Sequence, residues 1–313
     1  MEMTMRNSNT TRASRRQLLA GVAASSMPIV SPAAAAPAPE TLVPDPNAHQ
    51  RGVTRAYAAD AQGQIHYRIA GKPSAKPPLM LLHPSPLSGY VFEVFMATMS
   101  RERLVIAPDT PGFGLSDPPL QRPEIADYAA AMLRLARTLK LGKIDVLGYH
   151  TGSATAVEMA LQSPATVQKL VILGASLLNE AELADFKARY VGRQIDDIPG
   201  AFARRWPVFR DKDWRMVASP ARQMNILLDS FRNPDVSHWG HRAALNYPLT
   251  EKMRAVPQKT LVINPEDDLW AYTGRAADLL KNVKVQAYPG WTHGFLDTKA
   301  SEVSSLIETF LQT

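Results

Sequence analysis

The first pattern in the sequence that could do chemistry is a histidine between two glycines, at the end of an apolar run. His150 is the centre of Gly148-Tyr149-His150-Thr151-Gly152, which follows the apolar residues Ile144 to Leu147. A central residue held at a strained positive φ needs neighbours without side chains, and histidine tolerates positive φ better than most residues. The pattern therefore predicts a sharp turn between a strand and a helix, with the His150 imidazole displayed for nucleophilic or acid–base chemistry.

Two patterns further along the chain supply carboxylates and a second histidine. Asp267 and Asp268 follow the apolar residues Leu261 to Ile263, and His293 follows the last apolar run, Val283 to Ala287. A carboxylate that accepts the N–H of a histidine fixes the tautomer of the ring and stabilises its protonated form. We therefore expect an aspartate of this loop to support His293.

The order of turn, acid and histidine resembles that of the α/β-hydrolase superfamily, and the resemblance extends over residues 52–313. Two loops add to it. His83-Pro84-Ser85-Pro86 resembles the loop after the third strand that helps to form the oxyanion hole, and residues 109–116 resemble the Asp-x-Pro-Gly-x-Gly-x-Ser loop after the fourth strand. The resemblance implies an α/β fold with a mostly parallel eight-stranded sheet flanked by helices.

The same resemblance assigns roles to individual residues. It implies His150, Asp268 and His293 as the catalytic set, and it leaves Asp267 as the alternative acid one residue earlier. The oxyanion hole is implied to be the backbone N–H of Thr151 together with one from Ser85 or its neighbour. His83 is expected to be structural and to hold its loop in place.

The sequence also departs from the superfamily pattern. His150 stands where a serine is usual, and Pro84 replaces the glycine that usually follows the loop histidine. Sequences with Gly-x-His-Thr-Gly resemble a subgroup that is mostly described only as hydrolases. Two chemistries fit: His150 attacks an acyl carbon and His293 activates the water that resolves the acyl-imidazole, or His150 is itself the base for direct attack by water.

We therefore predict a hydrolase that acts on an ester, lactone or amide of a small molecule. The alternatives are a non-catalytic homologue that binds a ligand, and a non-hydrolytic member such as a lyase. No cofactor is expected. No metal is expected either, because His238 and His241, the one spaced histidine pair, lack a convincing third ligand. The sequence sets no oligomeric state.

Alternating apolar runs and helical periods predict the elements that must position these residues. Residues 54–60 and 64–70 are predicted to form a hairpin. Strands buried on both faces are predicted at six short apolar runs: residues 79–82, 104–107, 144–147, 170–173, 261–263 and 283–287. Helices are predicted over residues 124–140, 151–162 and 302–311. The core is expected over residues 51–178 and 258–313, and residues 179–257 are expected to form a helical cap between strands six and seven.

The amino terminus predicts export. Arg15 and Arg16 precede an apolar run from Leu18 to Val30 that is shorter than a membrane span, and small residues follow it. This resembles a twin-arginine signal peptide of residues 1–36, cleaved near Ala35 or Ala36, with residues 37–50 as a linker. We expect the twin-arginine export machinery to deliver the protein to the periplasm.

Composition and charge exclude other classes of protein. The chain of 313 residues is 45% hydrophobic and 20% charged, as in globular proteins, and it contains no cysteine, so disulfides and thiolate chemistry are excluded. Four arginines against one glutamate give residues 1–36 a charge of +3, half of the total of +6. The small surplus left for the body argues against nucleic acid as a partner.

Overall fold

The structure is a computed structural model that describes residues 52–191, 195, 197–211, 214, 216–280 and 283–313. The predicted signal peptide, residues 1–36, and the predicted linker, residues 37–50, lie outside the described residues. In the part of the chain that is described, no helix is both long enough and apolar enough to cross a membrane.

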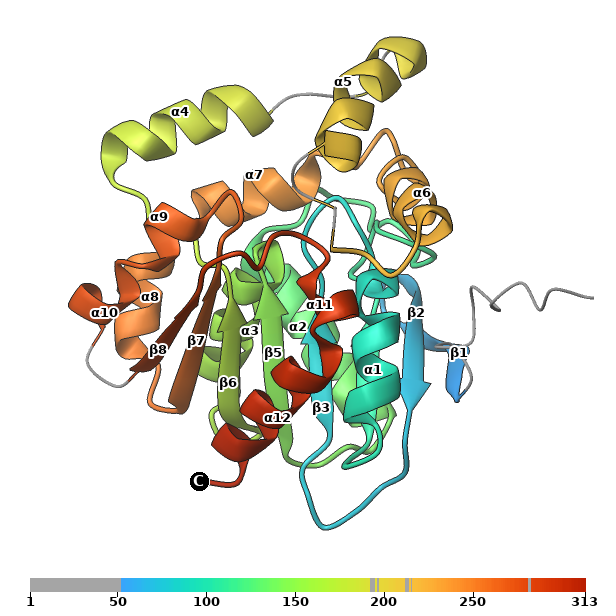
Figure 1. Ribbon diagram of the computed structural model, residues 1–313. Helices are drawn as coiled ribbons and strands as arrows, with labels where there is room; N and C mark the ends of the chain where they lie inside the picture. The colour runs from blue at the N-terminus through green and yellow to red at the C-terminus, as the bar shows by residue number, and fades with distance from the viewer. Residues whose placement is uncertain (1–51, 192–194, 196, 212–213, 215, 281–282) are drawn as a thin grey trace, which may run out of the picture. The chain divides into compact units, whose positions relative to one another are not determined.

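An eight-stranded sheet runs through the described residues in the order β1-β2-β4-β3-β5-β6-β7-β8 (Figure 1). β2 pairs antiparallel with β1 and with β4, and all other neighbours are parallel. The predicted hairpin and the mostly parallel sheet are therefore confirmed. The strands are β1 (Val53–Asp60), β2 (Gly63–Ala70), β3 (Leu79–Leu82), β4 (Val105–Pro108), β5 (Ile144–Tyr149), β6 (Val167–Leu173), β7 (Lys259–Pro265) and β8 (Val283–Tyr288).

Helices cover both faces of the sheet. α1, α11 and α12 pack together on one face, and α2, α3 and α8 pack on the other (Figure 1). These helices are α1 (Glu93–Met99), α2 (Ile125–Thr138), α3 (Thr151–Gln162), α8 (Leu249–Ala255), α11 (Phe295–Thr298) and α12 (Ala300–Leu311). The short elements η2 (Gly89–Phe92), α9 (Trp270–Thr273) and α10 (Ala276–Leu279) lie in the connections.

The inner strands are apolar along their length because helices cover both of their faces. All four residues of β3 are fully buried, and β5 is buried at every position. Our expectation that residues 283–287 form a strand buried on both faces is wrong. β8 is the last strand of the sheet and pairs with β7 alone, so its residues are half-buried or exposed, and Lys284 faces solvent.

The helical cap predicted between the sixth and seventh strands is confirmed. α4 to α7 follow β6 and extend beyond the carboxyl ends of β5 and β6 (Figure 1). α7 packs on α2, α3 and α4, and α5 packs on α6, so the cap is anchored over the helix that begins beside His150. α8 also falls within residues 179–257 but packs on α3. The cap helices are α4 (Glu180–Tyr190), α5 (Ile198–Asp211), α6 (Pro220–Asp229) and α7 (Trp239–Asn246).

Candidate active site

His150 occupies a strained turn between β5 and α3, as its two glycine neighbours predict. Its φ is 50° and its ψ is −110°, a combination that few residues with side chains adopt. A Cβ on Gly148 would collide with the carbonyl of Gly152, and a Cβ on Gly152 would collide with the carbonyl of Leu82. The glycines therefore let strand, turn and helix meet closely, and the turn holds His150 at the carboxyl edge of the sheet.

The imidazole of His150 is bonded to a buried carboxylate. Its Nε2 lies 2.8 Å from Oδ2 of Asp267, whose side chain is fully buried. The other oxygen of Asp267 accepts the backbone N–H of Leu269 at 2.9 Å, and the Tyr149 hydroxyl donates to Oδ2 at 3.5 Å. Because this carboxylate is held from several sides, it can fix the orientation and the tautomer of the His150 ring.

Gly174 makes room for that ring, and the sequence analysis missed it. It follows the last residue of β6, with φ at +65°. A Cβ at this position would lie 2.5 Å from Cδ2 and 2.8 Å from Nε2 of His150. The only signal in the sequence is a glycine directly after a buried strand, which many α/β loops share.

The second histidine pairs with the second aspartate. Nε2 of His293 lies 3.2 Å from Oδ1 of Asp268, and the same oxygen is 3.8 Å from Nε2 of His150. The two imidazole centroids are 5.5 Å apart, so the structure brings His150, Asp268 and His293 together. The predicted acid, Asp268, lies beside His293, and its alternative, Asp267, is bonded to His150.

Electrostatics keep Asp268 ionised. Its side chain borders the pocket and is 45% accessible. Burial raises its pKa, but the charge of His150 and the hydrogen bond and charge of His293 outweigh burial and hold the pKa below its ordinary value. The ionised carboxylate can therefore accept a hydrogen bond from His293.

The predicted oxyanion loop lies against the start of α3. The Ser85 N–H donates to Oγ1 of Thr151 at 3.4 Å, and the Thr151 N–H is the first of α3, where no intrahelical acceptor exists. Nε2 of His83 accepts the N–H of Thr110 at 2.9 Å, so its Nδ1 carries the proton and donates to the carbonyl of Pro84 at 3.0 Å. Burial lowers the pKa of His83, which keeps this loop-holding ring neutral.

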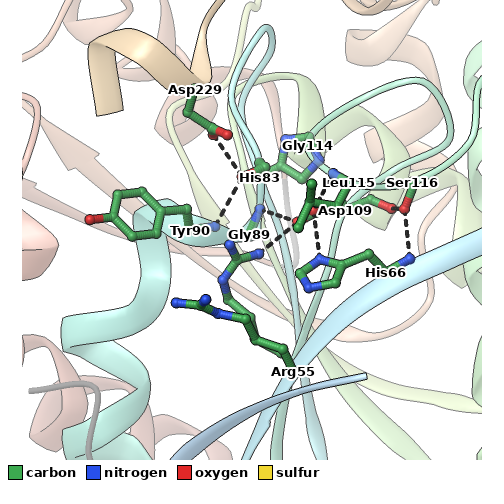
Figure 2. A network of polar contacts seen from close by, with 12 residues as sticks. Arg55, His66, His83, Gly89, Tyr90, Asp109, Gly114, Leu115, Ser116 and Asp229 are labelled. Atoms are coloured by element: carbon green, nitrogen blue, oxygen red, sulfur yellow. Dashed lines mark hydrogen bonds and ion pairs between the residues drawn. The ribbon is translucent and has the colours of Figure 1, made fainter. Parts of the chain in front are cut away.

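A buried ionic network supports the loop that was recognised by its Asp-x-Pro-Gly pattern. Figure 2 shows Asp109 at its centre, accepting hydrogen bonds from the N–H groups of Gly89 and Leu115, each at 2.9 Å. His66 lies 2.8 Å and Arg68 2.9 Å from the same carboxylate. Although burial raises the pKa of Asp109, these partners together lower it. The network thus joins Gly89, which follows the oxyanion loop, to the loop of residues 109–116.

A hydrogen bond joins the cap to Ser88, which lies just after the oxyanion loop. The Ser88 hydroxyl donates to Oδ2 of Asp229, the last residue of α6, at 2.6 Å, and it also accepts the N–H of Tyr90. Burial raises the pKa of Asp229. The cap is therefore held in register with the loop that follows β3.

A pocket of about 400 Å³ lies between the cap and the sheet edge. His150, Asp268 and His293 line one part of it, and Trp214 lines another, with its ring 5.2 Å from that of His293. The remaining lining residues come from the oxyanion loop and the cap: Pro84, Ser85, Pro86, Leu87, Arg189, Tyr190, Ile195, Ala201, Arg204, Arg205, Val208, Phe209, Ser230, Ser237, His238 and His241. The volume suits a small molecule.

The site also contains a set of side chains that could hold a metal ion. One ligand atom each from His150, Asp267, Asp268 and His293 lies within 4.8 Å of the others. Two imidazole nitrogens and two carboxylate oxygens are ligands that zinc and similar divalent ions accept, at distances of about 2.0–2.2 Å. The sequence analysis considered only His238 and His241 as a metal pair and did not foresee this group.

Comparison with known proteins adds to this geometry. Residues 77–300 match a family described as having the alpha/beta hydrolase fold. A 2-(acetamidomethylene)succinate hydrolase of Mesorhizobium japonicum is 34% identical over 124 residues, which are 39% of this chain and 44% of that protein. A proline iminopeptidase of Lactobacillus helveticus is 26% identical over 277 residues, 79% of this chain and 94% of its own length. Matches to several other curated relatives span only about a third of their length.

Solved structures share the fold. An esterase from Thermogutta terrifontis superposes with a TM-score of 0.67 at 19% identity, covering 83% of this chain and 98% of its own. At this level of identity the likeness concerns the fold alone.

Proposed function

The chain belongs to the α/β-hydrolase fold family, and on that premise we propose that it hydrolyses an ester, lactone or amide bond of a small molecule with His150 acting directly. One observation carries the proposal. The His150 ring lines the pocket, and its Nε2 is bonded at 2.8 Å to the buried carboxylate of Asp267. A histidine whose one N–H is held by a buried carboxylate has the arrangement of a catalytic base.

The hydrogen bond to Asp267 supports a role for the other ring nitrogen. A carboxylate only accepts hydrogen bonds, so the proton of the neutral ring lies on Nε2 and the lone pair on Nδ1. As a base, Nδ1 takes a proton from water while the water oxygen attacks the acyl carbon. The leaving group then departs with the proton that the imidazolium returns. As a nucleophile, the same lone pair attacks the acyl carbon, the bond to the alcohol or amine breaks, and protonated His293 supplies the proton with which that group leaves. Neutral His293 then takes a proton from water, whose oxygen attacks the acyl-imidazole and releases the acid and His150.

The oxyanion that forms in either route has two backbone donors nearby. The Thr151 N–H begins α3, and the Ser85 N–H now makes only a long bond of 3.4 Å to the Thr151 hydroxyl. Turning that N–H toward a bound carbonyl oxygen would therefore cost little. Each such donor typically contributes about 2.7–4 kcal/mol to the transition state.

The relatives named above support hydrolysis without fixing the bond. By name, one hydrolyses an acetamidomethylene succinate and another is a peptidase, while the esterase shares only the fold. We also propose that the mature chain works in the periplasm after twin-arginine export, because Arg15 and Arg16 precede the apolar run of the amino terminus.

The test is an activity screen of the mature protein on p-nitrophenyl esters, lactones and amides, repeated on His150→Ala. His238→Ala is the matched control, because His238 also lines the pocket but belongs to neither histidine–aspartate pair. Turnover by the parent and by His238→Ala, with loss in His150→Ala, supports the proposal. If the parent turns over none of the three substrate classes, the proposal is contradicted, and a non-catalytic homologue that binds a ligand becomes the better interpretation.

A second candidate function is favoured by the four clustered ligand atoms. His150, Asp267, Asp268 and His293 would then hold a divalent ion, and such an ion would supply an activated water. The two candidates differ in one measurement. Dialysis against a strong chelator should leave the activity of a metal-free histidine base unchanged, whereas loss of activity that zinc or manganese restores would favour the metal-dependent reading.

A further inference from the structure

Two arginines on α5 place positive charge on the cap side of the pocket. Arg204 and Arg205 line the pocket, as does Arg189 of α4. The charge of Arg189 is matched by an ion pair with Asp185. Among the described residues, no carboxylate lies within ion-pair distance of Arg204 or Arg205.

The guanidinium of Arg205 is held in place by uncharged groups. One of its nitrogens, Nη1, donates to the carbonyl of Ser230 at 2.6 Å and contacts the Ser230 hydroxyl at 3.1 Å. The guanidinium carbon lies 4.5 Å from the centre of the Phe231 ring. This arrangement orients the group rigidly and uses one side of it, which leaves other N–H donors available to a ligand.

A half-buried cation without a counter-ion is costly. Burial, and then the neighbouring charge of Arg204, lower the pKa of Arg205. The charge also reaches the reaction site, because it contributes, after burial and the charge of His150, to the lowered pKa of His241. The two aspartates at the site are engaged by His150 and His293, so they do not neutralise Arg205.

We propose that Arg205, with Arg204 beside it, binds an oxyanionic group of the ligand, a carboxylate or a phosphate. The fork of a guanidinium matches the two oxygens of either group, and the resulting ion pair gives Arg205 the counter-charge that no described carboxylate provides. The substrate would thus be an ester, lactone or amide that carries a separate anionic group. Assigning the anion to a substrate rests on the proposed function, whereas the anion site does not.

Two esters that differ in one charge test the proposal. We compare p-nitrophenyl butyrate with mono-p-nitrophenyl glutarate, whose acyl chain ends in a carboxylate. The parent should favour the charged ester in kcat/KM by at least tenfold, and Arg205→Gln should reduce that ratio by at least tenfold, mainly through KM. Arg232→Gln is the control, because Arg232 is an exposed cap arginine that pairs with Asp229 and does not line the pocket. It should keep the parent ratio.

Direct binding separates this proposal from the proposed function. Calorimetry with glutarate and, separately, inorganic phosphate measures the anion site even if neither ester is hydrolysed, and the tighter of the two identifies the group. Binding that weakens at least tenfold in Arg205→Gln and weakens with added salt supports the site. If Arg205→Gln does not fold, the charge-retaining Arg205→Lys and the exposed Arg204→Gln replace it. An unchanged ester ratio, or no binding of either anion by the parent, overturns the proposal.

Discussion

Nε2 of His150 lies 2.8 Å from Oδ2 of Asp267 and 3.8 Å from Oδ1 of Asp268. The imidazole is therefore bonded to the buried aspartate, and the pocket-facing aspartate is left to His293, 3.2 Å away. Two adjacent residues of one loop thus serve two histidines from different parts of the chain. The site therefore contains two histidine–aspartate pairs, His150 with Asp267 and His293 with Asp268.

Replacing Asp267 should damage catalysis without unfolding the protein. In Asp267→Asn the amide can donate to Nε2, which would move the ring proton to Nδ1 and remove the reactive lone pair. We expect kcat to fall by about 10²–10⁴-fold, as for the orienting acid of a catalytic triad. Asp268→Asn should also lower kcat, because it mis-sets His293. Steady-state kinetics and far-ultraviolet circular dichroism measure both; full activity in Asp267→Asn would disprove the assigned pairing.

Gly174 should be intolerant of even one methyl group. In Gly174→Ala the new Cβ would press on Cδ2 of His150 from 2.5 Å and displace the ring from Asp267. A shift of that kind typically costs about 10²-fold in rate. Gly142→Ala is the matched control, since Gly142 has a similar φ of +67° and nothing within 4 Å of an added Cβ. Both variants should lose stability, but only Gly174→Ala should lose kcat; equal kcat in the two would refute the role of Gly174.

Stability should decline in mild acid. Burial, chiefly, lowers the pKa of His241 from 6.5 to about 4. Between these values the unfolded chain binds a proton that the folded chain does not, so the free energy of unfolding rises with pH from about 4 to 6.5 and is lost on acidification. One such group contributes at most about 3 kcal/mol.

Urea unfolding at several pH values in this range measures the effect. His241→Gln should flatten the slope, with a remainder from His83, whose pKa burial also lowers. A slope identical to that of the parent would contradict the prediction, because it would mean that folding does not lower the pKa of His241.

Export can be tested separately from catalysis. Changing Arg15 and Arg16 together to Lys should leave the protein in the cytoplasm, because the twin arginine is the feature that predicts the route. Cell fractionation of a tagged chain measures it, with the unchanged chain as control. Normal periplasmic accumulation of the double variant would rule out this route.

Local signals predicted much of the fold and part of the site. The turn at His150 could be predicted from the sequence because its determinants, two glycines after an apolar strand, lie close together in the chain. Which histidine each of Asp267 and Asp268 contacts could not be predicted from the sequence, because it depends on the turn that follows Pro265. There the N–H of Asp267 bonds to the Pro265 carbonyl at 2.9 Å and its carboxylate caps Leu269.

Long-range packing explains the other gaps. Arg205 has uncharged partners and no carboxylate among the described residues, which depends on how α5 and α6 bring it to Ser230 and Phe231. Nothing in the sequence reports that packing. The position of β8 at the sheet edge is likewise a matter of strand order, which its short apolar pattern does not encode.

The most direct measurement is chemical rescue of His150→Ala by added imidazole, on the best ester found in the screen. If His150 is the base or the nucleophile, kcat should fall by at least about 10²-fold in the variant, and free imidazole should restore part of it in a saturable manner, with the dependence on pH that an unprotonated imidazole requires. The same imidazole should not raise the activity of Asp267→Asn, in which the ring is still present. A variant His150→Ala that hydrolyses the ester as fast as the parent would contradict the account.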